Sequence, residues 1–516
     1  MLQINNFSVK IKEKIIVDSL TLEIGDGEVV GLVGESGSGK SMTALGVMGL
    51  LPHTAEISSG RILLDSQNLL EKSAQEMRNL RGRDISMIFQ EPMTSLNPTM
   101  KIGRQLMEVF AVHSEKYSKD EAKKQVIDIL KSVGLNDAGR VFDSYPHELS
   151  GGMRQRAMIA MAMLLKPKLL IADEPTTALD VTVQKQILDM LTRLKDSASG
   201  HKMSILFITH DLELARHFCD RVAVMKDGVI VEQGDAARVM EAPSHEYTKK
   251  LIDAVPGRYT GRKKHMDTVS RGRDKVLSVS GLSAYYRNKR KGIFDKQTLM
   301  KAVDDVSFDV YRGEVLGLVG ESGCGKTSLS KALLGVNPDV RGSIERGNGS
   351  ARMIFQDPYS SLNPSYTIGW LLEEPLKAAG VKSAGERRKR VNDMLRMIDM
   401  EGYNDRYPGE LSGGQRQRVS IGQALITEPE LVIADEPVSA LDVTIQAQIM
   451  ELMLKMQEKM GLSYIFISHD MNVISRMCDR VMVMKSGSII ESGSTEEIFE
   501  HPKQEYTKKL LDAAWR

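Results

Sequence analysis

The sequence predicts an α/β protein made of two tandem copies of one domain, each built around a parallel β-sheet covered by helices. Two observations support this prediction. Six sequence blocks occur twice in the same order, and within each copy short apolar runs alternate with stretches of helical periodicity. Continuously apolar runs suit strands buried on both faces, and strand–helix alternation is typical of parallel sheets.

The expected elements follow in chain order. The first residues, MLQINNFSVKIKEK, are interpreted as an opening strand and not as a secretory signal, because they lack a long apolar run. Further strands are expected at EVVGLVG, KPKLLIADEP and KMSILFITH, and in the second copy at EVLGLVG, EPELVIADEP and GLSYIFISH. Helices are expected at residues 181–197 and, as an insertion, at 114–131 and 384–400.

The internal repeat fixes the domain organisation. GLVGESGSGKS (31–41) recurs as GLVGESGCGKT (317–327), and MIFQEPMTSLNP (87–98) recurs as MIFQDPYSSLNP (353–364). The period is about half the chain, much longer than any solenoid repeat. We therefore expect one domain with a C-terminal extension at residues 1–256 and a second at 276–516. The basic segment 257–275 between them is interpreted as a solvated linker, with a lipid or nucleic-acid patch as the alternative.

Composition excludes several classes of protein. At 516 residues the chain is long enough for several domains, and 69 basic against 68 acidic residues leave a net charge of +1, with no excess positive field for nucleic acid. No apolar run approaches the length of about 18 residues that spans a bilayer. The cysteines at 219, 324 and 478 are too scattered for a disulfide framework, a zinc site or an iron–sulfur cluster, so a reducing, cytoplasmic setting is expected.

The first repeated block contains a phosphate-binding motif. GESGSGKS matches G-x-x-x-x-G-K-[ST] directly after a predicted strand, where backbone N–H groups at a helix N-terminus cradle phosphates. Lys40 and Lys326 are expected to reach the β- and γ-phosphates. The predicted nucleotide-binding residues of the two loops are Gly34, Glu35, Ser36, Gly37, Ser38, Gly39, Lys40, Ser41 and Met42, and Gly320, Glu321, Ser322, Gly323, Cys324, Gly325, Lys326, Thr327 and Ser328.

Two neighbouring carboxylates end a later apolar strand in each copy. Asp173 and Glu174 follow LLIA, and Asp435 and Glu436 follow LVIA. The first carboxylate of each pair is expected to help hold Mg²⁺ with the hydroxyl that ends the phosphate loop, and the second to accept a proton from an attacking water. Paired carboxylates at a strand end are often merely solvated, but the preceding phosphate loop favours the catalytic interpretation.

A second anion-binding device follows from the blocks ELSGGMRQR and ELSGGQRQR. Each places a serine and two glycines at the expected N-terminus of a helix, where backbone N–H groups attract phosphate. The phosphate loop already binds the phosphates of one nucleotide, so a second anion-binding helix N-terminus in the same domain is not needed for that nucleotide. The residues are Ser150, Gly151 and Gly152, and Ser412, Gly413 and Gly414.

With these motifs the chain resembles the ATP-binding cassette (ABC) ATPases, in which LSGGQ of one cassette closes over ATP held by the phosphate loop of the other. The resemblance implies two P-loop NTPase domains, each with a RecA-like parallel-sheet core, an antiparallel β subdomain and a helical signature subdomain, and ATP and Mg²⁺ as cofactors. It makes Asp180 and Asp442 the D-loop aspartates. The catalytic residues it implies are Glu174, Glu436, the switch histidines His210 and His469, and the Q-loop glutamines Gln90 and Gln356; the Mg²⁺ ligands are Ser41, Gln90, Asp173, Thr327, Gln356 and Asp435.

A narrower resemblance concerns SLNP after each Q-loop and the tails APSHEYTKKL and HPKQEYTKKL. These are similar to the oligopeptide, dipeptide and nickel importer ATPases, here in a fused form. The resemblance implies an ATPase at the cytoplasmic face of the cell membrane that binds two transmembrane permease subunits and, through them, an extracytoplasmic solute-binding protein. ATP binding would close the two halves and hydrolysis would reopen them. The solute, whether peptide, nickel, glutathione or another, stays open.

Three departures from the family pattern stand out. Fifty residues separate Lys40 from Gln90 but only 30 separate Lys326 from Gln356, so the second copy is expected to lack about a hairpin of the antiparallel sheet. The ring that stacks on adenine is not obvious in the first copy, where Ile11 occupies the expected place and Phe7 is the nearest ring; Tyr285 or Tyr286 is expected to serve in the second. The cysteine cluster found after the core in some relatives is absent.

Two other functions compete with import. One is a soluble tandem ATPase acting on the ribosome or DNA; the neutral net charge and the short linker argue against it. The other is a nucleotide-sensing scaffold without turnover, which is disfavoured because both predicted general bases are present.

Overall fold

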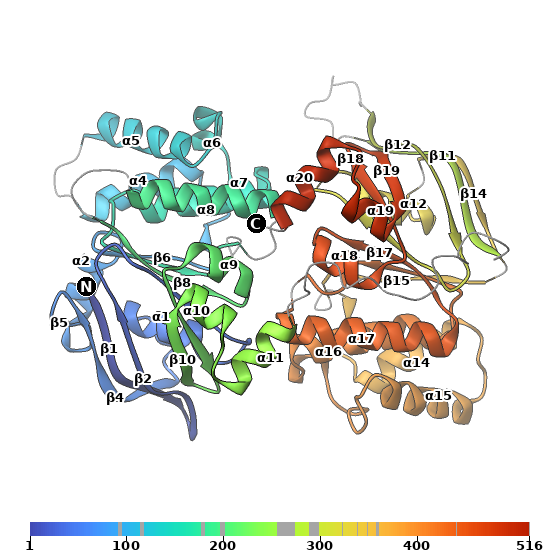
Figure 1. Ribbon diagram of the computed structural model, residues 1–516, viewed down its shortest axis with the longest axis horizontal. Helices are drawn as coiled ribbons and strands as arrows, with labels where there is room; N and C mark the ends of the chain where they lie inside the picture. The colour runs from blue at the N-terminus through green and yellow to red at the C-terminus, as the bar shows by residue number, and fades with distance from the viewer. Residues whose placement is uncertain are drawn as a thin grey trace. The chain divides into compact units, whose positions relative to one another are not determined.

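The computed structural model describes residues 1–90, 95–113, 118–176, 181–196, 202–254, 274–287, 299–321, 323–337, 339–347, 349–357, 361–439 and 441–514. The chain forms two compact units whose main division falls between Val255 and Pro256, and each unit is described by itself (Figure 1). Among the described residues no helix is both long and apolar enough to cross a membrane.

The core of the first unit is a six-stranded sheet in the order β10-β9-β3-β8-β7-β6, parallel except for the edge strand β10. Because parallel strands carry their carboxyl ends at one edge, the segments that follow β3, β7 and β8 meet there. The strands are β3 (Val29–Val33), β6 (Ile85–Ile88), β7 (Leu169–Asp173), β8 (Ser204–Thr209), β9 (Arg221–Lys226) and β10 (Val229–Asp235).

Alternate residues of the central strand pack into two separate cores, which is why that strand is apolar throughout. Val30 and Leu32 pack with the antiparallel sheet and α1, whereas Val29 and Val33 pack with the helices on the other face. All four side chains are at most 2% exposed. This burial on both faces is what a continuous apolar run predicts.

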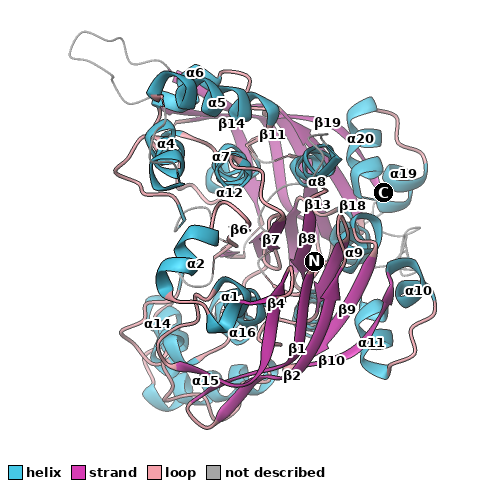
Figure 2. Ribbon diagram, turned by 90° about the vertical axis from the view of Figure 1, so that its left-hand side faces the viewer, coloured by secondary structure: helices cyan, strands magenta, loops and turns pink. Residues whose placement is uncertain are grey.

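A separate antiparallel sheet, in the order β2-β1-β4-β5, lies at the opposite end of the unit from helices α5 and α6 (Figures 1 and 2). Its strands are β1 (Leu2–Ile11), β2 (Lys14–Ile24), β4 (Ala55–Leu64) and β5 (Gln67–Asn68). The helices are α1 (Lys40–Met48), α2 (Ala74–Leu80), α4 (Ile102–His113), α5 (Lys119–Ser132), α6 (Ala138–Asp143), α7 (Gly151–Met163), α8 (Val181–Asp196), α9 (Leu212–Phe218), α10 (Ala236–Glu241) and α11 (Glu246–Ala254).

The second unit repeats this architecture, with a six-stranded sheet in the order β15-β16-β17-β13-β18-β19 and a three-stranded sheet in the order β12-β11-β14. Its strands are β11 (Lys275–Arg287), β12 (Leu299–Tyr311), β13 (Val315–Val319), β14 (Val340–Arg346), β15 (Ala351–Ile354), β16 (Leu431–Asp435), β17 (Ser463–Ser468), β18 (Arg480–Lys485) and β19 (Ser488–Ser494). Its helices are α12 (Lys326–Leu333), α14 (Ile368–Ala378), α15 (Ala384–Met397), α16 (Gly413–Leu425), α17 (Val443–Met460), α18 (Met471–Met477), α19 (Thr495–Glu500) and α20 (Glu505–Ala514).

The shorter spacing in the second copy removes one short strand and one helix, and not the whole hairpin that the spacing predicts. The first unit has β5, which pairs with β4, and then the capped helix α2 before β6. In the second unit β14 ends at Arg346 and β15 begins at Ala351, which leaves no room for either element. The sequence spacing therefore indicated the lost strand but not the lost helix.

Candidate ATP-binding and hydrolysis sites

The phosphate loop of each unit connects the central strand to a helix, as the motif predicts. Gly39 and Gly325 directly precede α1 and α12 with φ of 105° and 113°, a region that favours glycine. Gly34 is required for a different reason, since a Cβ there would lie 2.2 Å from the carbonyl oxygen of Met225. The loop is therefore packed tightly against the end of β9.

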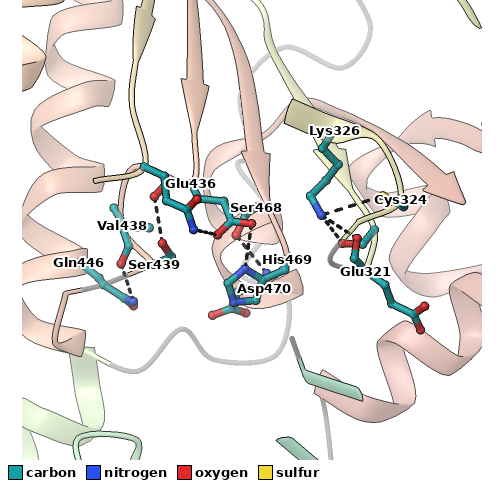
Figure 3. Close-up of polar contacts among 12 residues, drawn as sticks. Glu321, Cys324, Lys326, Glu436, Val438, Ser439, Gln446, Ser468, His469 and Asp470 are labelled. Carbon is teal, nitrogen blue, oxygen red and sulfur yellow. Dashed lines mark hydrogen bonds and ion pairs between the residues drawn. The ribbon is translucent and has the colours of Figure 1, made fainter. Parts of the chain in front are cut away.

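The loop lysine of each unit is buried and bonded to the loop itself. Lys40 Nζ donates to the carbonyl oxygens of Gly34 at 2.7 Å and Glu35 at 2.8 Å. Lys326 Nζ makes the same bonds to Gly320 at 2.7 Å and Glu321 at 3.0 Å (Figure 3). These carbonyls hold the ammonium group above the cradle, and phosphate oxygens can replace them as its partners.

A glutamate, a histidine and a glutamine come together beside each loop. In the first unit the Glu174 carboxylate lies 3.1 Å from His210 Nδ1 and accepts a hydrogen bond from Gln90 Nε2 at 2.9 Å. In the second unit the Glu436 carboxylate lies 3.2 Å from His469 Nδ1 and accepts from Gln356 Nε2 at 2.9 Å. Figure 3 shows Glu436 and His469 pointing toward each other from the ends of their strands.

Both glutamates have an unusual backbone. Glu174 and Glu436 have φ of 47° and 48°, a left-handed conformation that costs a residue with a side chain about 1 to 3 kcal/mol. Their N–H groups donate to the neighbouring strand, at Ile208 O and Ile467 O, which holds the strained geometry. Such strain persists where the surroundings fix it, and here it turns each carboxylate toward the histidine.

The histidine of each pair favours its charged form, and in the second unit the glutamate does too. Burial lowers the pKa of His210, but the hydrogen bond and charge of Glu174 outweigh burial, so the pKa stands above its ordinary value. His469 shows the same raised pKa beside Glu436. Burial raises the pKa of Glu436, and the His469 contact outweighs it, leaving that pKa below its ordinary value. The imidazolium and carboxylate therefore stabilise each other.

The first carboxylate of each pair lies deeper and pairs with the hydroxyl at the end of the loop. Burial raises the pKa of Asp173 to about 6, and the Ser41 hydroxyl, which hydrogen-bonds to it, opposes that rise. Asp435 and Thr327 repeat the arrangement, again with a raised pKa caused by burial. Asp173 Oδ1 is buried and has no hydrogen-bond partner among the described residues. An unpartnered carboxylate oxygen beside a hydroxyl fits a divalent cation with oxygen ligands.

The predicted ligands do not all meet at this pair. Gln90 and Gln356 direct their amide groups to the glutamates. Among the described residues no hydrogen bond joins either glutamine to the aspartate–hydroxyl pair. Their assignment as Mg²⁺ ligands therefore stays a prediction.

The signature serines cap helices, as predicted, but the two caps differ. Ser150 accepts from Met153 N at 3.3 Å at the start of α7, and Ser412 accepts from Gln415 N at 3.3 Å at the start of α16. Gln415 also accepts from Ser412 N at 3.0 Å, which closes a reciprocal capping box. In the first unit Met153 stands where the second has Gln415, and its side chain has no polar group that could accept from Ser150 N. The two signature blocks differ visibly at this position, but the difference in capping was not predicted.

The structure narrows the choice of adenine-facing residues. Phe7 is 0% exposed beneath α1, so it cannot stack on a base. Ile11 pairs with Lys14 and Tyr286 pairs with Met300 in the corresponding hairpins, so Tyr286 is the counterpart of Ile11. The Tyr285 ring instead faces the Arg341 guanidinium at 5.0 Å.

Two predicted residues lie outside the described residues, Ser322 of the second phosphate loop and the D-loop Asp180. Asp442, the counterpart of Asp180, caps α17 by accepting from Ile445 N at 3.0 Å. The three cysteines are buried thiols. Cys324 Sγ lies 4.0 Å from Lys326 Nζ, at the position where the first loop has Ser38.

Two protein families match most of the chain. The family described as "ABC transporter" matches residues 17–177 and 303–439. The family described as "Oligopeptide/dipeptide transporter, C-terminal region" matches residues 231–276 and 490–516. Each family matches twice, once in each copy of the internal repeat.

Curated relatives match over nearly the full length. The chain is 43% identical to "Peptidoglycan transport ATP-binding protein YejF" of Agrobacterium fabrum over 97% of this chain and 93% of the relative. It is 43% identical to "Glutathione import ATP-binding protein GsiA" of Pectobacterium atrosepticum over 96% of this chain and 86% of the relative. It is 41% identical to "Uncharacterized ABC transporter ATP-binding protein YejF" of Escherichia coli over 99% of both chains.

A solved structure supports the tandem fold. "RNase-L Inhibitor" superposes with a TM-score of 0.63 at 21% identity, over 96% of this chain and 91% of that one, which bears on the fold alone. Together the family matches, the duplicated phosphate loops and the near-full-length relatives show what the chain is. It belongs to the ABC transporter family of ATP-binding proteins, as a tandem member with oligopeptide/dipeptide transporter C-terminal regions, and is an ATPase coupled to transport.

Proposed function

We propose that both units hydrolyse Mg-ATP with Glu174 and Glu436 as general bases, and that this hydrolysis drives import of a peptide-like solute through two permease subunits. The observation that supports turnover most strongly is the strained glutamate held between a histidine and a glutamine beside each phosphate loop. A general base must lie within hydrogen-bond reach of the water it activates, and a carboxylate held in place beside the phosphate loop supports that role. Turnover of Mg-ATP by the purified chain tests the first half of the proposal.

Magnesium belongs to this proposal because of the aspartate–hydroxyl pairs. Asp173 with Ser41, and Asp435 with Thr327, are assigned to the cation, which would neutralise charge on the β- and γ-phosphates. Replacing Asp173 and Asp435 by asparagine removes the negative charge and keeps the size of the side chain. We expect these variants to need a higher Mg²⁺ concentration for half-maximal ATPase rate; an unchanged Mg²⁺ dependence in both contradicts the assignment.

Each complete site is proposed to draw residues from both units, following the family pattern. The two units would be an intramolecular ATPase dimer that ATP closes and hydrolysis reopens. Site one would combine Lys40, Ser41, Asp173, Glu174 and His210 with Ser412 and Gly414. Site two would combine Lys326, Thr327, Asp435, Glu436 and His469 with Ser150 and Gly152.

The solute and partners follow from the relatives. Two relatives are named for glutathione import and peptidoglycan transport, and the C-terminal regions match a family named for oligopeptides and dipeptides. We therefore propose glutathione or a small peptide as the solute, delivered by an extracytoplasmic binding protein. The chain would act at the cytoplasmic face of the membrane, with residues 257–275 as the linker between its domains.

The permease is proposed to dock beside the Q-loops, at residues 91–99 and 357–365. Residues 91–94 and 358–360 of these ranges lie outside the described residues. Next to the ranges large rings are exposed: Phe89 is 38% exposed, Phe355 is 51% exposed, and the Tyr366 and Trp370 rings stack at 3.7 Å between centroids. Exposed apolar groups of this size often mark protein interfaces. The Q-loop glutamine that follows each phenylalanine touches the general base, so this surface is linked to the nucleotide site.

Cysteine cross-linking tests this docking. Thr99→Cys and Ser365→Cys place a thiol at matching exposed positions, and Glu13→Cys on the turn between β1 and β2 is the control. We expect both Q-loop variants to form disulfides with cysteines scanned along the cytoplasmic helices of the permease, and the control to form none. Failure of both Q-loop variants across the scan in an assembled complex would overturn the docking proposal.

A further inference from the structure

The C-terminal helix of each unit reaches the phosphate loop of the same unit. The hydroxyl of Tyr247, on α11, accepts a hydrogen bond from Glu35 N at 3.4 Å, across 212 residues of sequence. The hydroxyl of Tyr506, on α20, accepts from Glu321 N at 3.0 Å, across 185 residues. Both contacts join the EYTKKL block of the C-terminal region to the second residue of a phosphate loop.

The residue held by the tyrosine is also the residue that holds the loop lysine. Glu35 donates its N–H to Tyr247, and its carbonyl oxygen accepts from Lys40 Nζ at 2.8 Å. Glu321 repeats this between Tyr506 and Lys326, the latter bond at 3.0 Å. When the lysine moves to a phosphate, Glu35 or Glu321 loses the hydrogen bond at its carbonyl oxygen. Its N–H group keeps the hydrogen bond to the tyrosine hydroxyl.

A half-buried carboxylate holds the start of each C-terminal helix in this position. Glu232, on β10, accepts from Ser244 N at 2.7 Å, Ser244 Oγ at 2.6 Å and His245 N at 3.1 Å, just before α11 begins. Glu491, on β19, accepts from Lys503 N at 2.7 Å and Gln504 N at 3.1 Å before α20. A carboxylate at a helix N-terminus also suits the helix dipole.

The tyrosine ring is equally constrained. Tyr247 is 8% exposed, and Lys226 Nζ lies 5.0 Å from its ring centroid. Lys485 Nζ lies 4.9 Å from the Tyr506 ring. Lys226 directly follows Met225, whose carbonyl oxygen packs on Gly34, so the strand end, the ring and the loop form one packed group.

We propose that Tyr247 and Tyr506 are positioning residues for ATP, which makes the C-terminal region part of each nucleotide site. The tyrosine holds the entry to the phosphate loop so that its amides stay aimed at the phosphates while the lysine changes partners. Preorganising a binding loop lowers the cost of ordering it when the ligand binds. This inference rests on ATP binding by both units and does not depend on the transport partners.

The test removes only the hydroxyl groups. Tyr247→Phe with Tyr506→Phe in the full chain is expected to raise the Kd and the KM for Mg-ATP about 2- to 12-fold, the range of one net hydrogen bond, with kcat nearly unchanged. Tyr464→Phe is the matched control, because Tyr464 is buried and its hydroxyl has no hydrogen-bond partner among the described residues. The control is expected to leave Kd, KM and kcat as in the unmodified chain.

A merely structural role gives a different result. In that case the phenylalanine variants lower the melting temperature of the nucleotide-free chain while the Kd for Mg-ATP stays the same, and the proposal is wrong. An equal rise in Kd in Tyr464→Phe also overturns it. Because Kd is measured by equilibrium binding, absence of hydrolysis in the unmodified chain would refute the proposed function and still leave the comparison of Kd values as a test of this inference.

Discussion

Replacing Glu174 and Glu436 together by glutamine is expected to lower the ATPase rate about 10²- to 10⁴-fold, because each change removes a positioned general base. ATP should still bind, since the contacts of Lys40 and Lys326 with their loops involve neither glutamate. Glutamine has the size of glutamate and meets the same left-handed backbone, so the fold should be kept. The measurements are steady-state phosphate release and equilibrium binding of labelled ATP.

The single variants separate the two sites. Glu174→Gln and Glu436→Gln alone each leave one intact glutamate–histidine pair, at 3.2 Å and 3.1 Å respectively. Residual turnover is expected in each if both sites are competent. Normal turnover in the double variant would show that neither glutamate is the base.

The second large effect is unequal ATP affinity of the two sites. Lys40→Ala is expected to disable site one and to leave site two intact. In the second unit Tyr286 occupies the register position that Ile11 has in the first unit. Stacking of a base on an aromatic ring is worth about 1 to 3 kcal/mol in nucleic-acid sites. We therefore expect the residual site in Lys40→Ala to bind ATP more tightly than the residual site in Lys326→Ala, by up to that amount.

Exchanging the two side chains supplies the control for this prediction. Ile11→Tyr in the Lys326→Ala background should tighten ATP binding, and Tyr286→Ile in the Lys40→Ala background should weaken it. Titration of the four variants with ATP measures each residual site. Equal affinities in the two lysine variants, unaltered by the exchange, would refute the inequality.

Sequence motifs predicted the parts of each site that depend on strand order. Because β3, β7 and β8 are neighbours in a parallel sheet, the loop lysine, the Asp173–Glu174 pair and His210 had to meet at one edge. The pairing of β16, β17 and β13 repeats this in the second unit. The fold followed from the same periodicity, and the family and full-length relatives confirm it.

Features that depend on side-chain packing were not predictable. The sequence leaves Phe7 as a candidate ring, but packing against α1 buries it completely. The EYTKKL repeat marks a C-terminal region without indicating that its tyrosine touches a loop about 200 residues earlier, because that contact depends on how Glu232 orients α11. The positive φ of Glu174 likewise follows from its bond to the neighbouring strand and not from a local turn signal.

Uptake of solute by reconstituted vesicles would show whether ATP hydrolysis by this chain powers import. The full chain would be added to vesicles containing the two permease subunits, with the solute-binding protein and labelled glutathione or peptide on the opposite side. We expect uptake that requires Mg-ATP on the side of the chain and stops with the Glu174→Gln, Glu436→Gln double variant. A chain that hydrolyses ATP at the same rate with and without the permease, and supports no uptake, would contradict the account.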